Sequence, residues 1–441
     1  MRAGRRRWLV ATFLAIVLVL GGGGSPNPLA ELAVQLTAAS LAIAWFLSPG
    51  HSQTPKPELR WIAAIVLLIP ALHLVPLPPA LWQSLPGREL QSEALALVGA
   101  QNDWRPLSIA PYQTLTSLLT MIVPAGLMLA TARLSGADVR RCLWTIVIAT
   151  AAAAWMAFAQ VLAEPGALRL YEETHRDWAT GFFANRNAAA DGFIIAMLAG
   201  ATLLTGRVTP AARTFLLAAT GAFLVAIVLT GSRAGFALAL LVLIIAALQT
   251  RSFGSRGSAR RIRWPAIALA SVILPVALVL AGWRGTLLGE RFLVGGDARW
   301  SLWQDGWAAI TAYWPVGSGL GTFQRAFLPF ERLEHVDFSM PNRMHNDYLE
   351  LMLEAGLPGL IALAVIGILI WRLIRSSFRS PCAPSPIAWF AIGTILLIAL
   401  HSAVDYPLRT MALSCLMAFA VGLLGNRNIT PVRSGGDGGV R

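Results

Sequence analysis

Apolar stretches recur along nearly the whole chain, separated by shorter polar segments. Twelve can be delimited, at roughly 8–22, 28–48, 61–79, 111–132, 142–163, 188–205, 213–230, 235–249, 264–283, 347–371, 386–402 and 409–424. A run of about 20 apolar residues can cross a bilayer as a helix. Of the 441 residues, 56% are hydrophobic and only 13% are charged, whereas soluble domains carry about 25% charged residues. The pattern predicts an all-α polytopic membrane protein with about twelve transmembrane helices.

Basic residues indicate the orientation of these helices. With the N-terminus in the cytoplasm, 22 of the 35 Lys and Arg residues fall in cytoplasmic segments, including the run at 251–263. Only Glu58, Asp138 and Asp437 of the 22 acidic residues fall on that side. Lys and Arg near span ends are retained in the cytoplasm. The net charge of +13 therefore reflects membrane topology, and we expect no nucleic-acid partner.

The polar segments divide the chain into three parts. Residues 1–7 are a basic cytoplasmic N-terminus, residues 8–425 a single transmembrane domain with a long outer loop at 284–346, and residues 426–441 a flexible cytoplasmic tail. The first apolar stretch resembles a signal peptide, but "GGGGSPN" after it offers no small-x-small cleavage site. We expect it to remain as an anchored first helix.

Several functional classes lack their sequence signals. Lys56 is the sole lysine and stands in "TPKPE", so no glycine-rich phosphate loop is present. There is no Asp-x-Asp pair, no zinc-finger spacing and no aromatic-rich RNA-binding motif. Cys142, Cys382 and Cys415 lie on the cytoplasmic side or within a span, which indicates neither a disulfide nor a zinc cluster. We expect no cofactor and no bound metal.

Four polar clusters fall on the outer side in this topology, at 180–192, 230–235, 284–346 and 401–409. Charged groups at a membrane boundary are costly unless they line a cavity or pair with one another. Their convergence on one side therefore indicates a functional site there.

The long outer loop carries an aromatic helix. Trp300, Trp303, Trp307, Ile310 and Trp314 follow one another at helical spacing, on one face. We expect an interfacial helix lying flat on the outer leaflet, with packing against the protein's own core as the alternative. The next segment, "PVGSGLGTF", is interpreted as a loop, with an anion-binding nest as the alternative.

The segment "MHNDYLELMLEAG" places polar residues at the start of the tenth apolar stretch. Asp347, with Glu350 three residues on, is expected to cap the helix that enters the membrane. That role leaves His345 unexplained. Imidazole accepts protons near neutral pH, so we interpret His345 as a group that reaches a reacting hydroxyl, with a structural histidine as the alternative.

Three arginines of the outer clusters are candidates for binding an anionic substrate. Arg233 sits in a short break between two spans, Arg299 begins the tryptophan helix, and Arg186 lies between two asparagines. The alternative for Arg233 is snorkelling to headgroups, and the alternative for Arg299 is unspecific binding of lipid phosphate. The alternative for Arg186 is a helix cap or a loop contact. Guanidinium groups bind diphosphate with two parallel hydrogen bonds and stay charged when partly buried. Together with His345, they suit a pocket that holds a lipid diphosphate while a hydroxyl displaces it.

The ordered motifs "GFFANRN", "TGSRAG", "RWSLW" leading to "PVGSGLGTF", and "HNDYLELMLEAGLPGL" resemble the O-antigen ligase and polymerase superfamily of bacterial membrane glycosyltransferases. With the hydropathy, the resemblance covers roughly residues 110–425, and "HSAVDYPL" fits the closing segment of the family. It implies a GT-C-like helical enzyme of the inner membrane that uses a polyprenyl-diphosphate-linked glycan without a metal, with its active site facing the periplasm.

The resemblance also implies roles for individual residues. Arg233 and Arg299 would hold the donor diphosphate, and His345 would activate the acceptor hydroxyl for an inverting displacement. Other polar residues of the motifs are expected to bind substrate: Asn185, Arg186, Asn187, Ser232, Asn346 and Asp405.

Members of this superfamily differ in the acceptor. A ligase joins a finished glycan to lipid A–core, a polymerase joins repeat units to each other, and a third branch transfers glycan to protein. The outer loop at 284–346 is shorter than in many polymerases, which favours the ligase. A lipid or secondary transporter is the alternative from another class, although the chain shows no inverted repeat in hydropathy and its polar residues lie away from mid-membrane.

Overall fold

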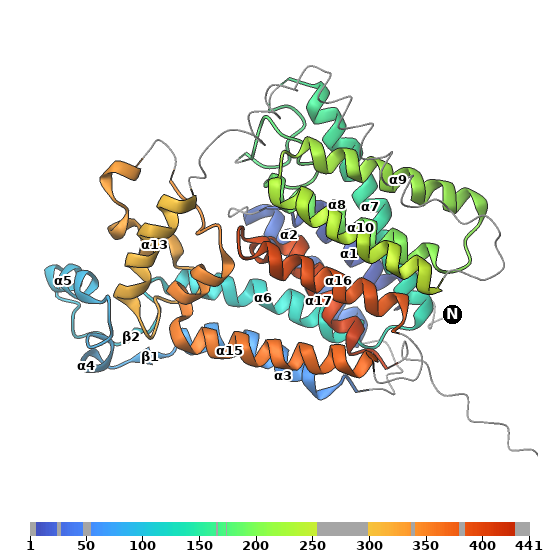
Figure 1. The fold of residues 1–441 in the computed structure, drawn as a ribbon. Coiled ribbons are helices and arrows are strands. Elements are labelled where there is room, and N and C mark those ends of the chain that lie inside the picture. The colour runs from blue at the N-terminus through green and yellow to red at the C-terminus, as the bar shows by residue number, and fades with distance from the viewer. Residues whose placement is uncertain are drawn as a thin grey trace, which may run out of the picture.

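The computed structural model describes residues 6–23, 28–46, 54–164, 166–172, 174–253, 299–336, 340–378 and 384–427. This part of the chain is almost entirely helical (Figure 1). Its one β-ladder pairs β1 (Pro76–Leu77) with β2 (Arg105–Pro106) in antiparallel register. The predicted all-α class is confirmed.

Each predicted apolar stretch within the described residues coincides with a helix, whereas stretch 264–283 lies outside them. The helices are α1 (Arg6–Leu20), α2 (Pro28–Phe46), α3 (Pro57–His73), α6 (Pro111–Thr131), α7 (Gly136–Leu162), α8 (Arg186–Leu204), α9 (Pro210–Leu229), α10 (Arg233–Phe253), α15 (Asp347–Phe378), α16 (Pro386–His401) and α17 (Met411–Leu424). Five of them, α6, α7, α8, α9 and α15, are long and apolar enough to cross a membrane. The total of about twelve spans and the GT-C-like arrangement remain predictions.

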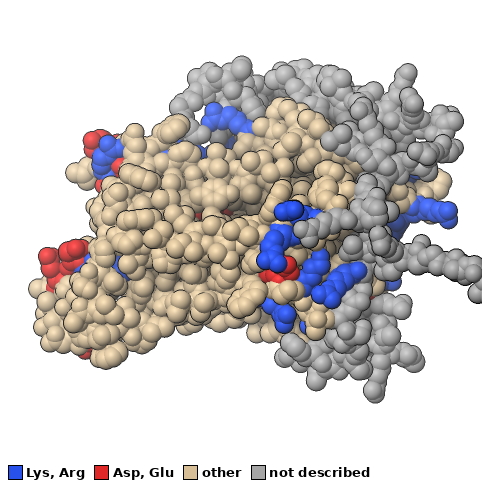
Figure 2. All heavy atoms as spheres, turned by 60° about the horizontal axis from the view of Figure 1, so that its bottom comes forward, with Lys and Arg blue, Asp and Glu red and all other residues tan. Residues whose placement is uncertain are grey.

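Contacts between helix ends follow the predicted alternation in the described part of the chain. We call the end of the bundle where α1 ends and α17 begins the long-loop end. There the N–H of Ala412 donates to the carbonyl of Gly21 and joins these two helices. At the opposite end, the Asn426 amide donates to the carbonyls of Thr131 and Leu134. Figure 2 shows a broad uncharged band beside a group of Lys and Arg side chains. Assignment of the long-loop end to the periplasm stays a prediction from the basic residues.

Helix α8 runs through the middle of the bundle. Every residue from Asn187 to Leu203 is buried, and the helix packs against α7, α9, α10 and α16. Its many Ala and Gly residues permit close approach of neighbouring helices. A Cβ added to Gly235 of α10, for example, would lie 2.5 Å from the Cβ of Ala190. This packing brings the first residues of α8 and α10 to the same end of the bundle.

Shorter helices gather around and beyond the start of α15 at the long-loop end (Figure 1). They include α4 (Pro79–Trp82), α5 (Glu89–Leu97), α13 (Arg299–Tyr313), α14 (Phe323–Phe327) and the 3-10 turns η2 (Leu328–Phe330) and η3 (Leu333–His335). A second apolar core joins α13 and α14 to the start of α15 and includes Ile310, Tyr313, Phe323, Met344 and Leu353.

The tryptophans of α13 face two environments. Ile310 is buried and Trp303 donates its indole N–H to the carbonyl of Met344, whereas Trp300, Trp307 and Trp314 are exposed. Packing against the protein's own core is therefore correct for one face of α13. Contact of the exposed indoles with the outer leaflet remains a prediction.

The segment 315–323 is a packed loop. The N–H groups of Ser318 and Gly319 donate to the carbonyls of Leu353 and Glu354, and the N–H of Leu320 donates to His73 Nδ1. These donors are used within the protein, so the loop interpretation is confirmed and the anion nest is wrong.

Helix α15 is kinked at Gly356, which has φ +55° and ψ −146°. Such a backbone conformation is open essentially to glycine alone, and an added Cβ would lie 2.1 Å from the carbonyl oxygen of Pro315. The N–H of Leu357 donates to the same oxygen. The kink therefore fixes the first turns of α15 against the loop that precedes α14.

Replacing Gly356 with alanine is expected to lower the free energy of unfolding by about 1–3 kcal/mol from backbone strain alone, and further because of the close contact. Gly367 lies in the same helix, and an added Cβ there meets nothing within 4 Å. Gly367→Ala is expected to leave stability unchanged or to raise it by up to about 1 kcal/mol. Thermal unfolding of both variants in one detergent checks the difference, and equal melting temperatures would contradict it.

Candidate active site at the long-loop end

A histidine and an aspartate from distant segments meet at the long-loop end. His345 precedes α15, Asp405 lies between α16 and α17, and His345 Nδ1 is 2.9 Å from Asp405 Oδ1. The imidazole is 27% exposed, while the carboxylate is buried. His345 has a backbone φ of +51°, which is uncommon for residues other than glycine. The fold thus fixes a partly exposed imidazole against a buried carboxylate.

The charge state of Asp405 determines the tautomer of His345. Burial on its own would raise the pKa of Asp405, but the hydrogen bond from His345 and the electrostatic interactions with His345, His401 and Arg299 lower it to about 2. The carboxylate is ionised at neutral pH and can only accept a hydrogen bond. His345 Nδ1 therefore carries the proton, and Nε2 remains as the atom that can take one up.

Tyr406 joins this pair to the start of α8. Its ring packs edge-on against His345, with 4.9 Å between the ring centroids. The hydroxyl interacts with the side chains of Asn185 and Asn342. Burial raises the pKa of Tyr406 to about 12, so the hydroxyl stays protonated at neutral pH.

Asn185, Arg186 and Asn187 form the first turn of α8. The Asn185 side-chain oxygen accepts a hydrogen bond of 2.7 Å from the N–H of Asn187, which makes Asn185 the cap of the helix. The Arg186 guanidinium lies 4.8 Å from the centre of the Trp178 ring. A Cβ on Gly231 would lie 2.2 Å from the same ring. Trp178 therefore contacts both the arginine of α8 and the turn before α10.

The turn before α10 ends with Ser232, and Arg233 begins the helix. Ser232 is buried, and its hydroxyl accepts a hydrogen bond from the N–H of Gly235, so it caps α10. Arg233 follows as the first, half-buried residue of the helix. Arg299, the half-buried first residue of α13, lies close enough to Asp405 for its charge to lower the pKa of that carboxyl.

The loop before α8 is fixed by Gln160 and Arg169. Gln160 accepts hydrogen bonds from Arg169 and from the N–H groups of Thr180 and Gly181, and Arg169 also donates to the carbonyl of Trp178. This loop carries His175. Burial and the charge of Arg186 lower the pKa of His175 to about 4, so its imidazole is neutral at pH 7. His345 and Asp405 also act on His175 electrostatically, which places it beside the pair.

The predicted cap of α15 is wrong. Asn346, the residue before the helix, accepts hydrogen bonds from the N–H groups of Tyr348 and Leu349 and donates to the carbonyl of Ala403. Asp347 instead accepts from the Ser402 hydroxyl. The helix begins at Asp347, so Asn346 occupies the cap position directly before it. From there its side-chain oxygen accepts hydrogen bonds from the free N–H groups of the first turn.

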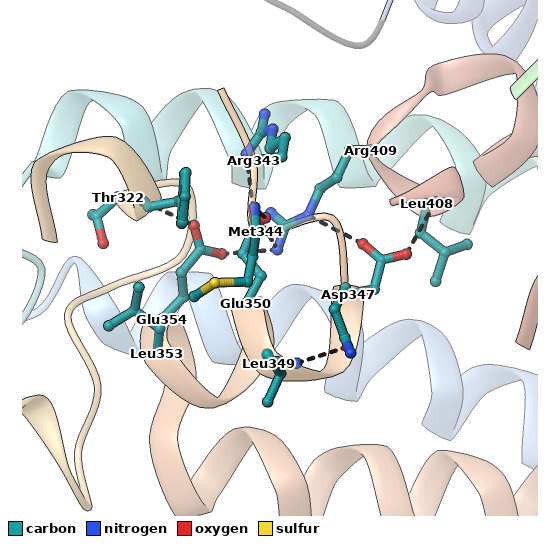
Figure 3. Close-up of polar contacts among 12 residues, drawn as sticks. Thr322, Arg343, Met344, Asp347, Leu349, Glu350, Leu353, Glu354, Leu408 and Arg409 are labelled. Atoms are coloured by element: carbon teal, nitrogen blue, oxygen red, sulfur yellow. Dashed lines mark hydrogen bonds and ion pairs between the residues drawn. The ribbon is translucent and has the colours of Figure 1, made fainter. Parts of the chain in front are cut away.

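Asp347, Glu350 and Glu354 belong to a buried ionic cluster (Figure 3). Arg409 Nη2 is 2.9 Å from Glu354 and 3.2 Å from Glu350. Glu350 also accepts from Arg343 and from the N–H of Met344, the residue before His345. Removing one partner from a buried group of charges is strongly destabilising. The cluster therefore fixes the segment of His345 against the loop of Asp405.

A second His–Asp pair lies deeper at the same end. His401, the last residue of α16, has its Nδ1 2.7 and 2.8 Å from the two carboxylate oxygens of Asp191 in α8. Both side chains are 1% exposed.

Among the described residues, no group of three or more His, Cys, Asp or Glu is placed to hold a metal ion. Cys142 and Cys415 are buried free thiols, and Cys382 lies outside the described residues. Independence from a metal remains a prediction.

The sequence motifs therefore fall at one end of the bundle, and the structure links Asn185, through Tyr406, to His345 and Asp405. Sequence reasoning missed four further residues there: His175, Trp178, Asp191 and Tyr406. Asp191 and Tyr406 lie within motifs already recognised, whereas His175 and Trp178 precede one by a few residues.

A comparison with family models matches residues 217–364 to the family described as O-antigen ligase. The matched segment contains Ser232, Arg233, Arg299, His345 and Asn346 and ends before Asp405. A search of curated proteins finds no match.

Proposed function

From the match of residues 217–364 to the O-antigen ligase family, we propose that the protein is an inverting, metal-independent glycosyltransferase. It moves a glycan from a polyprenyl diphosphate to a hydroxyl of lipid A–core at the periplasmic face of the inner membrane. This match supports an enzyme of the glycosyltransferase or ligase type. The observation that carries the finer proposal is the His345–Asp405 pair at the end of the bundle that also presents Arg186, Arg233 and Arg299.

His345 is the proposed base. Its Nε2 takes the proton of the acceptor hydroxyl, while ionised Asp405 on Nδ1 orients the ring and stabilises the imidazolium that forms. The acceptor oxygen attacks the anomeric carbon from the side opposite the leaving group. The bond between that carbon and the diphosphate oxygen breaks, and its electron pair leaves with the polyprenyl diphosphate.

Arginines are the proposed partners of the diphosphate. Arg233 and Arg299 each open a helix at the long-loop end, and Arg186 lies on the same end against Trp178. Guanidinium groups pair with phosphate oxygens through two parallel hydrogen bonds. Their charges stabilise the leaving diphosphate, which is the task that a metal performs in many nucleotide-dependent transferases.

The acceptor separates ligase from polymerase and from protein glycosylation. Purified protein in detergent is given a polyprenyl-diphosphate glycan together with lipid A–core, a second donor molecule or an acceptor protein, and products are identified by mass spectrometry. The proposal expects glycan on lipid A–core. Glycan joined only to the second donor assigns a polymerase, and glycan only on protein assigns the third branch; either result overturns the ligase proposal.

A further inference from the structure

The buried pair of His401 and Asp191 has an open nitrogen. Asp191 binds His401 Nδ1 with both carboxylate oxygens, so Nδ1 carries a proton. His401 Nε2 is shielded from solvent and has no hydrogen-bond partner in the described protein. A buried polar atom without a partner costs about 1–3 kcal/mol. Such an atom calls for an explanation.

The surroundings of His401 connect it to the proposed transfer site. The N–H of Asp405 donates to the carbonyl of His401 over 2.9 Å. Besides Asp191, the charges that act on the His401 ring are those of Asp405 and Arg299. The ring thus lies within electrostatic reach of the carboxylate that orients His345 and of an arginine assigned to the diphosphate.

The two His–Asp pairs share one connectivity. In each, a carboxylate binds Nδ1 and leaves Nε2 outside the pair. They differ in burial, because His345 is 27% exposed and His401 is 1% exposed. A partly exposed imidazole suits an incoming hydroxyl, whereas a buried one, held by a carboxylate in a low-dielectric site, suits a hydrogen bond to a charged group.

We propose that His401, as an imidazolium paired with the Asp191 carboxylate, binds the diphosphate of the lipid donor by donating a hydrogen bond from Nε2–H to a phosphate oxygen, with Asp191 as the residue that positions the ring. This inference rests on the proposed function. His345 then serves the acceptor hydroxyl and His401 the leaving group. No proton is transferred from His401. Its hydrogen bond stabilises the negative charge that develops on the leaving diphosphate.

Two variants test the role. His401→Phe removes the donor and is expected to weaken binding of a polyprenyl diphosphate by about 10- to 100-fold, in line with the loss of one hydrogen bond to a charged group. Asp191→Asn keeps the shape but weakens the orientation of the ring, and a smaller loss of the same kind is expected. His335→Phe is the matched control, because His335 of η3 forms an Nδ1 pair with Asp305 of α13. The affinity of this variant for the diphosphate should equal that of the wild type.

A measurement on the wild-type protein reads the His401 ring directly and needs a variant only for assignment. With ¹⁵N-histidine labelling, the Nε2 resonance of His401, assigned by its loss in His401→Phe or His401→Gln, is expected to shift when geranyl diphosphate is added and to stay in place with geraniol. An unchanged resonance, or the same shift with both lipids, overturns the proposal and assigns the atom to a buried water. Wild-type affinity in His401→Phe and Asp191→Asn overturns it too. Absence of transfer by the wild-type protein would instead overturn the proposed function.

Discussion

Replacing His345 with glutamine is expected to slow glycan transfer by about 10²–10⁴-fold, because a positioned base contributes that much to a reaction that moves a proton. Glutamine keeps a hydrogen bond to Asp405 but cannot take up a proton at neutral pH. Turnover per folded molecule, measured with purified protein and a polyprenyl-diphosphate glycan, checks this. The melting temperature should change little, since the imidazole is partly exposed.

Two further variants separate chemistry from structure at the same pair. Asp405→Asn keeps the shape of the side chain but loses the charge that fixes the Nδ1 proton, so turnover should fall while the affinity for the donor stays near that of the wild type. His335→Gln alters the histidine of η3 and should keep full activity. Near wild-type turnover in His345→Gln would remove His345 as the base.

Truncating Arg233 or Arg299 to alanine is expected to weaken binding of the donor diphosphate by about 2–5 kcal/mol, the usual loss when one partner of a desolvated charge pair is removed. Lysine at either position keeps the charge but loses the planar pair of donors, so partial affinity should return. Binding of polyprenyl diphosphate to each purified variant gives the measurement.

The control for these variants is Arg325→Ala, which removes an exposed arginine from α14. It should bind the donor like the wild type. If both Arg233→Ala and Arg299→Ala retained wild-type affinity, the diphosphate would have to bind elsewhere.

The helices and the alternation of their directions could be predicted, because a helix that crosses a bilayer needs a run of about 20 apolar residues. Every predicted stretch within the described residues is a helix. The sidedness of the motifs followed from the same pattern. Arg186, Arg233, His345 and Asp405 lie at one end because successive spans alternate in direction.

Pairing of side chains was beyond sequence reasoning, because it depends on how the spans pack. His345 and Asp405 are 60 residues apart, and His401 and Asp191 are 210 apart. Nothing in the spacing of either pair predicts a contact. Trp178 was missed for the same reason, since its partners, Arg186 and Gly231, come from different helix ends.

The start of α15 shows a different kind of error. The capping pattern of Asp347 and Glu350 is sound for an isolated helix. Here both carboxylates form ion pairs with Arg409, and Asn346 caps the helix instead. Local rules fail where a tertiary partner offers a stronger interaction. Loss of that partner, as in Arg409→Ala, would leave three carboxylates buried without it.

The proposed function requires this end of the bundle to break the bond between the glycan and the lipid diphosphate and to pass the glycan to an acceptor. The most direct measurement is the release of polyprenyl diphosphate by wild-type protein in detergent with a chelator present. We predict one polyprenyl diphosphate released for each glycan transferred, and little release without acceptor. Movement of intact donor across proteoliposomes with no release under any acceptor would contradict the claim and assign the protein to the transporters.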